Sequence, residues 1–170
     1  QTTVTNALGH ASVSTVDPAW GLSTAMVDPN LKRTDLDYDA LGRLASVWAP
    51  GSVKGTDKAN ATFAYYVRKD AATAISTSKL NLDGTYTTTW ALSDGLMRTR
   101  QTQTPSPSGG RLVTETFYDS VGRASKVFDE YHTGGNPSGD LITSTERALV
   151  PDQTRTVYDG AGRKTAEIFQ

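Results

Sequence analysis

Apolar and polar positions alternate with a period of two through much of the chain. Leu36 and Tyr38 alternate with Asp35 and Asp37, and Leu44 and Trp48 share a face just beyond them. Such a period places successive side chains on opposite faces of a β-strand. The alternation recurs around two later turn sequences, at residues 112–118 and 124–128 and again at residues 154–158 and 166–168. The chain is therefore predicted to form strands joined in pairs by short turns.

A short phrase, Tyr-Asp-x-x-Gly-Arg, separates the strands of each of these pairs. Asp at the first position of a type I turn can accept hydrogen bonds from backbone amides that follow it, and Gly at the fourth position tolerates the positive φ of a bulged hairpin. The phrase therefore predicts hairpin turns. Its copies are Tyr38, Asp39, Gly42 and Arg43; Tyr118, Asp119, Gly122 and Arg123; and Tyr158, Asp159, Gly162 and Arg163.

Two degenerate copies extend the array. One keeps Asn6 and Gly9 without the Tyr or the Arg, and the other keeps Asp94 and Arg98 without the Gly. Turn signals that recur every 8 to 12 residues are typical of all-β proteins. In this chain a spacing of 11 residues separates successive members of the series Asn6, Asp17, Asp28 and Asp39, and it recurs between Asp83 and Asp94 and between Asp129 and Asp140.

Three segments interrupt the regular pattern. Residues 49–61, 104–110 and 133–140 are rich in Gly, Pro and Ser. These residue types favour turns and irregular backbone, so we expect exposed loops here, inserted into a single repeat array over residues 1–170.

The repeated phrase resembles the YD repeat of the RHS-repeat proteins, and the resemblance covers essentially the whole chain. It implies an all-β fold in which consecutive antiparallel β-hairpins form a curved, coiling sheet. Family members include bacterial polymorphic toxins, insecticidal toxin complexes and teneurins. In the bacterial members a shell of such repeats encloses a toxic C-terminal domain. The resemblance thus implies a structural segment of a large secreted or cell-surface protein, with the rest of the shell and the enclosed effector domain as its partners.

The amino-acid composition argues against several classes of function and of fold. The 17 basic and 18 acidic residues give a net charge of −1, which disfavours binding to nucleic acid or to an anionic membrane. The hydrophobic fraction of 36% suits a thin sheet better than a thick core. No apolar run approaches the ~20 residues of a membrane-spanning helix, and the absence of Cys excludes disulfides and thiolate metal sites. Because Gln1 stands where an initiator Met would be, we expect a segment of a larger protein.

Candidate catalytic chemistry is sparse. No nucleophile-elbow, P-loop or HExxH motif occurs, and the two His residues, His10 and His132, lie far apart in the sequence. We therefore expect no enzymatic activity, no cofactor and no metal. Asp35, Asp37 and Asp39 could share one face and hold Ca²⁺, but a solvated acidic face is the favoured interpretation.

Two further motifs are expected to be incidental. Asp17-Pro18-Ala19-Trp20-Gly21-Leu22 resembles the self-cleavage signature Asp-Pro-x-Gly-Leu of RHS toxins with one extra residue, Trp20, and is interpreted as an ordinary Asp-Pro turn. The glycosylation sequon at Asn60 matters only in a glycosylating secretory route.

The aromatic and basic residues leave alternatives open. The motif arginines could form a ladder that binds an anionic glycan, but a structural role is favoured, in which each Arg bonds carbonyls or the turn Asp, or stacks on a Tyr. The motif tyrosines could stack on sugars, whereas cross-strand packing on a buried face is favoured. Trp48 and Trp90 are candidates for stacking on glycans, which makes an adhesive glycan-binding module the second hypothesis. Open strand edges also predict self-association.

Overall fold

The structure is a computed structural model that describes residues 1–142, 150 and 152–170. Throughout these ranges the regular elements are all β-strands, and no helix occurs among them. None of these residues therefore belongs to a helix long and apolar enough to cross a membrane. The strands are β1 (Thr2–Thr5), β2 (Ala11–Val16), β3 (Ser23–Val27), β4 (Arg33–Tyr38), β5 (Leu44–Trp48), β6 (Ala61–Tyr66), β7 (Thr73–Leu80), β8 (Tyr86–Ser93), β9 (Thr99–Pro105), β10 (Arg111–Tyr118), β11 (Ala124–Thr133), β12 (Gln153–Tyr158) and β13 (Lys164–Phe169).

The strands follow one another in a single 13-stranded sheet whose spatial order is the order of the sequence. Each strand is thus followed along the chain by its neighbour in the sheet, and the paired registers run antiparallel, as in β4 with β5 and β10 with β11. This confirms the all-β fold of consecutive antiparallel hairpins. Thr is frequent in these strands, and its branched Cβ suits the pleated backbone.

The chain divides into two compact units. The first comprises residues 1–64 and 77–87, and the second comprises residues 65–76 and 88–170. In the first unit the buried apolar side chains are few and mostly small, with Ala25, Leu36 and Ala59 among them. A unit of this kind depends on strand pairing more than on a thick apolar core.

The second unit holds the larger apolar cluster, formed by Val113, Phe128, Tyr131, Ile142 and Val150. Phe128 and Tyr131 meet edge to face with ring centroids 6.2 Å apart. Aromatic pairs prefer this geometry because the positive edge of one ring meets the negative face of the other. The cluster therefore fixes β10 and β11 against residues that follow them in the sequence.

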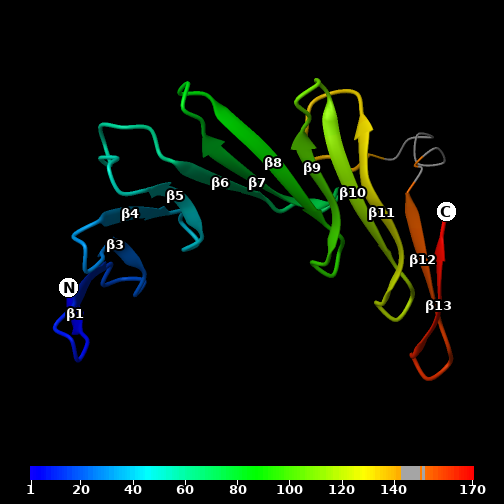
Figure 1. Cartoon of the computed structure of the whole chain (residues 1–170), viewed down its shortest axis with the longest axis horizontal. Coiled ribbons are helices and arrows are strands. Elements are labelled where there is room, and N and C mark those ends of the chain that lie inside the picture. Colours follow the sequence, from blue (N-terminus) through cyan, green and yellow to red (C-terminus); the bar gives the residue numbers. More distant parts are fainter. Residues whose placement is uncertain (143–149, 151) are drawn as a thin grey trace. The chain divides into compact units, whose positions relative to one another are not determined.

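Within the second unit, β9, β10 and β11 lie side by side, and the turns that end β8, β10 and β12 lie at the same end of their strands (Figure 1). Every second turn lies at the same end of the strands because antiparallel strands reverse direction at each step. The repeated phrase is thereby brought into a row of neighbouring turns.

Two details differ from the sequence prediction. Asp129 lies inside β11 and does not begin a turn, because this strand continues to Thr133. Residues 104–110 form a tight hairpin turn closed by the Ser106 amide and the Gly110 carbonyl at 3.1 Å, and β9 extends into the segment as far as Pro105. The segment that precedes β6 lies between strands as expected, although Ala59 within it is buried.

Candidate functional site

Eight hairpin turns among the described residues share one backbone geometry, which defines the repeated unit. In the turn at Asp39, the Asp39 amide donates to the Arg43 carbonyl at 2.9 Å and the Gly42 amide donates to the Asp39 carbonyl at 2.9 Å. The fourth residue has positive φ, 74° at Gly42, which closes a type I turn with a bulge. The same two bonds occur in the turns 6–10, 28–32, 81–85, 94–98, 106–110, 119–123 and 159–163. The unit is therefore more widespread than the phrase that predicts it.

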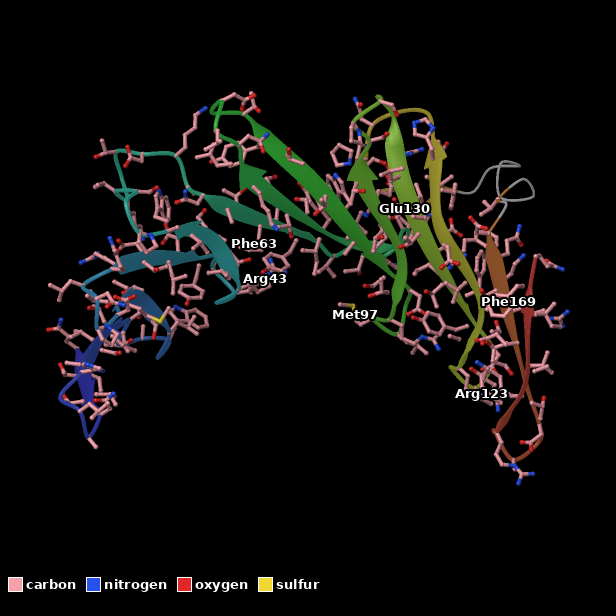
Figure 2. All side chains as sticks on the ribbon, viewed as in Figure 1. Arg43, Phe63, Met97, Arg123, Glu130 and Phe169 are labelled. Atoms are coloured by element: carbon pink, nitrogen blue, oxygen red, sulfur yellow. The ribbon has the colours of Figure 1, made fainter. Side chains whose placement is uncertain are left out.

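Two of these turns place a bulky residue where the others have Gly. Leu31 and Met97 both have φ of 60°, in the left-handed region. Figure 2 shows Met97 at the turn between β8 and β9. A side chain there is strained, since its Cβ crowds the following carbonyl oxygen. The degenerate turn that lacks Gly thus keeps the geometry of the complete phrase.

In four of the turns the Asp carboxylate bonds both backbone amides and the arginine side chain of the same turn. In the central turn, Oδ1 of Asp94 accepts the amides of Leu96 and Arg98, at 2.9 and 3.0 Å. Its Oδ2 accepts Nε of Arg98 at 2.8 Å. The hydrogen bond from Arg98, helped by the backbone amides, holds the pKa of the Asp94 carboxyl below its usual value. The carboxylates of Asp39, Asp119 and Asp159 have the same partners in their own turns.

In the second unit two of the turn arginines, Arg98 and Arg123, also reach the tyrosine of the next repeat. The guanidinium carbon of Arg98 lies 4.1 Å from the ring centroid of Tyr118. That of Arg123 lies 4.4 Å from the ring centroid of Tyr158, beside the turn between β10 and β11 (Figure 2). Both distances fall within the range of a cation–π contact. Each arginine therefore links the carboxylate of its own turn to the aromatic ring of the following one.

The hydroxyl of each stacked tyrosine also bonds the backbone next to the arginine that stacks on its ring. The Tyr118 hydroxyl donates to the carbonyl of Thr99 at 2.8 Å, and the Tyr158 hydroxyl donates to the carbonyl of Ala124 at 2.9 Å. Thr99 and Ala124 directly follow the stacking arginines in the sequence. We call this arrangement of carboxylate, arginine, tyrosine and carbonyl the turn-to-turn joint.

Glycine in the phrase has a second role at this joint. A Cβ built on Gly122 would lie 3.0 Å from a terminal nitrogen of Arg98, and one built on Gly162 would lie 3.3 Å from the same atom of Arg123. The arginine of one turn therefore occupies the space beside the glycine of the next. Only a residue without a side chain provides that space and also accepts positive φ.

Arg163 in the last described turn is different. It bonds Asp159 through Nε at 2.8 Å, as the other arginines bond their own carboxylates, yet its side chain is 81% exposed. The side chains of Arg98 and Arg123 are 28% and 34% exposed. Among the described residues no aromatic ring lies over Arg163, so the last joint has a carboxylate and an arginine without a tyrosine.

In the first unit a related contact forms between the turn at Asp39 and the preceding hairpin, with other side chains in place of arginine. The Tyr38 hydroxyl donates to the carbonyl of Ser23 at 2.8 Å. A Cβ on Gly42 would lie 3.3 Å from the indole of Trp20 and 3.4 Å from Leu22, so these apolar residues occupy the space that arginine fills elsewhere. Asp17 accepts the amides of Ala19 and Trp20 in an ordinary turn. The extra residue of the Asp-Pro sequence thus supplies the covering ring.

A buried polar cluster, formed by Gln101, Gln103 and Glu115, lies on β9 and β10. Gln103 is 0% exposed and Glu115 is 1% exposed. The Gln101 side-chain amide donates to Glu115, and that of Gln103 donates to Oε1 of Gln101 at 2.7 Å. Arg100 donates to Oε2 of Glu115 at 3.3 Å. Hydrogen bonds between its members offset the cost of burying them.

This cluster also holds the segment that follows β11. Oε1 of Gln103 accepts the amide of Ser138 at 2.9 Å, and Nε2 of Gln103 donates to the carbonyl of Asp140 at 2.8 Å. Arg68 bonds Oδ1 of Asp140 at 2.8 Å. Residues 137–139 are therefore partly buried, which differs from the exposed loop predicted for residues 133–140.

The tryptophans proposed to stack on glycans have protein partners. Trp90 lies 5.3 Å from Tyr66, centroid to centroid, and a Cβ on Gly139 would lie 2.8 Å from its ring. The indole nitrogen of Trp48 donates to the Asp57 carbonyl at 3.0 Å, and Nζ of Lys54 lies 5.4 Å from its ring centroid. Both rings contribute to packing within their own units.

The predicted solvated acidic face is wrong for Asp35. This side chain is buried, with 8% of the residue exposed, and Arg33 donates to both of its oxygens, at 2.8 and 2.6 Å. The hydrogen bond from Arg33 lowers the pKa of the Asp35 carboxyl. Asp37 instead pairs with Lys54 at 3.1 Å, and Asp39 belongs to the turn. Each carboxylate thus has its own cationic partner.

The remaining polar candidates have local partners. Asn6 bonds the ring of His10 at 3.5 Å, and its Oδ1 accepts the amides of Leu8 and His10. His132 bonds the carbonyl of Gly109 at 2.8 Å, and Oδ1 of Asn60 accepts the Ala49 amide at 2.7 Å. Across residues 1–142, 150 and 152–170, no group of three or more His, Asp or Glu side chains is arranged to hold a metal ion.

The motif tyrosines lie only partly buried, and in the second unit they pack under arginine. This differs from the expected cross-strand packing on a buried face, because the bulge between Phe117 and Tyr118 shifts the register at that point. Sequence reasoning missed the buried cluster altogether, since Gln and Glu in a strand are normally solvent-facing. A signal was present in the spacing of two between Gln101 and Gln103, which puts both on one face.

Comparison with known proteins supports the fold. No family model matches the sequence, and no curated protein matches it at a significant level. Among solved structures, the crystal structure of TcdB2-TccC3 matches with a TM-score of 0.78 over 98% of this chain, at 15% sequence identity. The match covers 11% of the TcdB2-TccC3 chain, so this protein spans about a ninth of that length. The resemblance carried by the repeated phrase is confirmed in the fold, since the match extends over nearly the whole array of consecutive hairpins.

Proposed function

We propose that this chain is a structural segment of an RHS-repeat shell that encapsulates or presents a toxin or effector domain of a large secreted bacterial protein. In this proposal residues 1–170 form one panel of a repeat array and carry no catalysis of their own. The motif residues from Asn6 to Arg163 serve to join successive hairpins. The partners are the rest of the shell and the enclosed domain.

The turn-to-turn joint carries the proposal. It repeats between Arg98 and Tyr118 and between Arg123 and Tyr158, and each joint couples neighbouring hairpins through a cation–π contact and a hydroxyl bond. A single hairpin is marginal in water, so a wall of hairpins requires couplings of this kind. Likeness in fold to an RHS-repeat protein supports the same role.

The test uses the full parent protein. Limited proteolysis should leave its effector domain intact while the array is intact, and the double variant Arg98→Gln with Arg123→Gln should render that domain sensitive to protease. Arg155→Gln provides the control, because this arginine is exposed on β12 and lies outside the repeated turns. An effector domain that is equally sensitive with and without an intact array would contradict encapsulation.

The alternative is a glycan-binding surface module. A glycan array probed with the chain and with Trp48→Ala and Trp90→Ala variants separates the two hypotheses. Glycan binding that depends on either tryptophan would favour the module. Loss of stability without any glycan signal would favour the structural role, because both rings already contact protein groups.

A further inference from the structure

The turn between β2 and β3 corresponds to a repeated turn that has no arginine. The Asp17 amide donates to the Leu22 carbonyl at 2.8 Å, and the equivalent bond closes the turn 94–98 at 2.9 Å. The Tyr38 hydroxyl bonds the carbonyl of the residue after Leu22, as the Tyr118 hydroxyl bonds that of the residue after the turn 94–98. Leu22 therefore stands where that turn has its stacking arginine.

The carboxylate of Asp17 lacks the partner that the repeated turns provide. Its Oδ1 accepts the amides of Ala19 and Trp20, at 2.7 and 3.2 Å. In the turn at Asp94, the second carboxylate oxygen accepts Nε of Arg98 at 2.8 Å. Among the described residues no cation pairs with Asp17, so no side chain there neutralises this half-buried carboxylate.

The tyrosine ring at this position also lacks its cation. In the second unit the guanidinium carbons of Arg98 and Arg123 lie 4.1 and 4.4 Å from the ring centroids of the tyrosines that follow them. No cation lies over the ring of Tyr38 in the part of the chain that the structure describes. A carboxylate and an aromatic ring that elsewhere share one arginine are thus present here without it.

A cavity of about 150 Å³ is lined by these same groups. Trp20 and Leu22 cover Gly42 but leave this space open. A cavity needs roughly 10–15 Å³ to hold one water molecule, so there is room for a planar group of several heavy atoms. The polar and aromatic groups of the lining include Asp17, Trp20, Tyr38 and Asp39.

The charges around the cavity favour a cation. Asp37 pairs with Nζ of Lys54 at 3.1 Å and Asp39 pairs with Arg43 at 2.6 Å, so these two carboxylates are compensated. The carboxylate of Asp17 is not. A guanidinium is planar and carries several N–H donors, so it can stack on an aromatic face and donate to a carboxylate at the same time.

We propose that the cavity at Asp17, Trp20 and Tyr38 binds a guanidinium group that this chain does not supply. The group donates to Oδ2 of Asp17 and stacks on the aromatic rings, as the turn arginines of the second unit do. An arginine side chain of another polypeptide and a small guanidinium compound share this chemistry. The site does not depend on the shell role proposed for the chain.

The experiment titrates the full chain with two probes, methylguanidinium and a capped tetrapeptide that has the sequence of residues 96–99, which includes Arg98. The Trp20 indole N–H and the amides of residues 17–22 are followed by NMR, and we expect saturable shifts with both probes. Tighter binding of the peptide assigns the site to an arginine of a polypeptide, and equal affinity assigns it to a small guanidinium compound. The same peptide with citrulline in place of arginine keeps the shape without the charge and should not shift these signals.

Variants of the carboxylate test the ion pair. Asp17→Asn should weaken binding about two- to fivefold, as expected for loss of a partly exposed ion pair. The turn should persist, because Asn6 accepts two backbone amides in its own turn. Asp28→Asn is the matched control and should leave binding unchanged, since Asp28 also accepts two amides of its turn but lies outside the cavity.

A variant of the missing position tests the cavity itself. Leu22→Arg places a guanidinium at the position equivalent to Arg98 and should prevent binding of both probes, whereas Leu22→Met should bind as the parent does. Full binding by a folded Leu22→Arg variant would overturn the proposal. So would equal shifts with the citrulline peptide, binding indifferent to Asp17→Asn, or the absence of a saturable shift with either probe.

Discussion

The guanidinium of Arg98 lies 4.1 Å from the ring centroid of Tyr118 while its Nε is bonded to Oδ2 of Asp94 at 2.8 Å. One side chain thus serves the turn that contains it and the turn that follows it. The arrangement explains why Asp, Arg and Tyr occur together in the repeated phrase. It also separates two contributions that mutation can resolve, since Arg163 keeps the first contact and has no ring over it in the part of the chain that the structure describes.

Arg98→Gln is expected to lower the free energy of unfolding more than Arg163→Gln. Both substitutions remove an ion pair with the aspartate of the same turn, but only the first removes a stacked ring. The difference should be about 0.5–1 kcal/mol, the usual value of an exposed cation–π contact. Urea unfolding followed by circular dichroism measures it. Equal losses in the two variants would show that the ring contributes nothing.

Gly122→Ala should destabilise the second unit more than Gly109→Ala. Both glycines have positive φ, 92° and 87°, so alanine is strained in either turn by about 1 kcal/mol. A Cβ on Gly109 meets nothing within 4 Å, whereas one on Gly122 lies 3.0 Å from a terminal nitrogen of Arg98. The excess loss for Gly122→Ala, measured by thermal unfolding, reports displacement of Arg98. It should vanish when Arg98→Gln is already present.

Met97→Gly is expected to stabilise the protein. Met97 has φ of 60° and is exposed, so its side chain adds strain with little burial to offset it. Relief of the strain, about 1–2 kcal/mol, exceeds the entropy cost of glycine, about 0.5–1 kcal/mol. Chemical denaturation should show a net gain of several tenths of a kcal/mol or more. Leu96→Gly, at the neighbouring exposed position of the same turn, has negative φ and should instead be neutral or destabilising. A loss of stability in Met97→Gly would mean that its side chain makes contacts worth more than the strain.

The local chemistry of the turns could be predicted from sequence because it resides in adjacent residues. Asp at the first position and Gly at the fourth specify a bulged turn without reference to the rest of the fold. Turns that lack the phrase, such as the one at Asp28, could be predicted from the 11-residue spacing of turn residues. Leu31 and Met97 have left-handed backbone only because the flanking strands impose it, and no local propensity indicates that.

Contacts between distant parts of the chain could not be predicted in the same way. That Arg123 contacts Tyr158 depends on which strand follows β11 in the sheet, across a long intervening segment. Asp35 was expected in solvent because carboxylates are rarely buried, and its pairing with Arg33 compensates for its burial. Gln103 was overlooked because Gln side chains are also mostly exposed in proteins.

Gln103→Ala should destabilise the second unit by about 2 kcal/mol. The substitution removes the acceptor of the Ser138 amide and the donor to the Asp140 carbonyl, which leaves buried polar groups without partners. Thr104→Ala, on the opposite face of β9, is the matched control and should cost less than about 1 kcal/mol. Hydrogen exchange should speed up at Ser138, whose amide loses its acceptor, in the first variant only. Unchanged exchange there would mean that other contacts hold the segment.

Acidification should destabilise the protein through the turn carboxylates. Hydrogen bonds from Arg98 to Asp94 and from Arg43 to Asp39 lower the pKa of both carboxyls in the folded state. A folded pKa below the unfolded value, about 3.9, gives stability that is present above that pH and is lost as pH falls through the folded pKa. Urea midpoints should therefore be steady from pH 7 to about 5 and fall below about 4.

The variant Asp94→Asn tests the origin of that loss. Asn6 shows that an amide oxygen can accept the two backbone amides of the same turn, so the turn geometry should persist. The variant should be less stable than the parent at neutral pH, where the Asp94 carboxylate is charged and bonded to Arg98, and the two proteins should converge as pH falls toward 2. Asp57→Asn, at a carboxylate outside the repeated turns, should leave the acid slope largely intact. If Asp94→Asn kept the full acid slope of the parent, the loss of stability at low pH would have to come from other carboxylates, such as Asp35 with its partner Arg33.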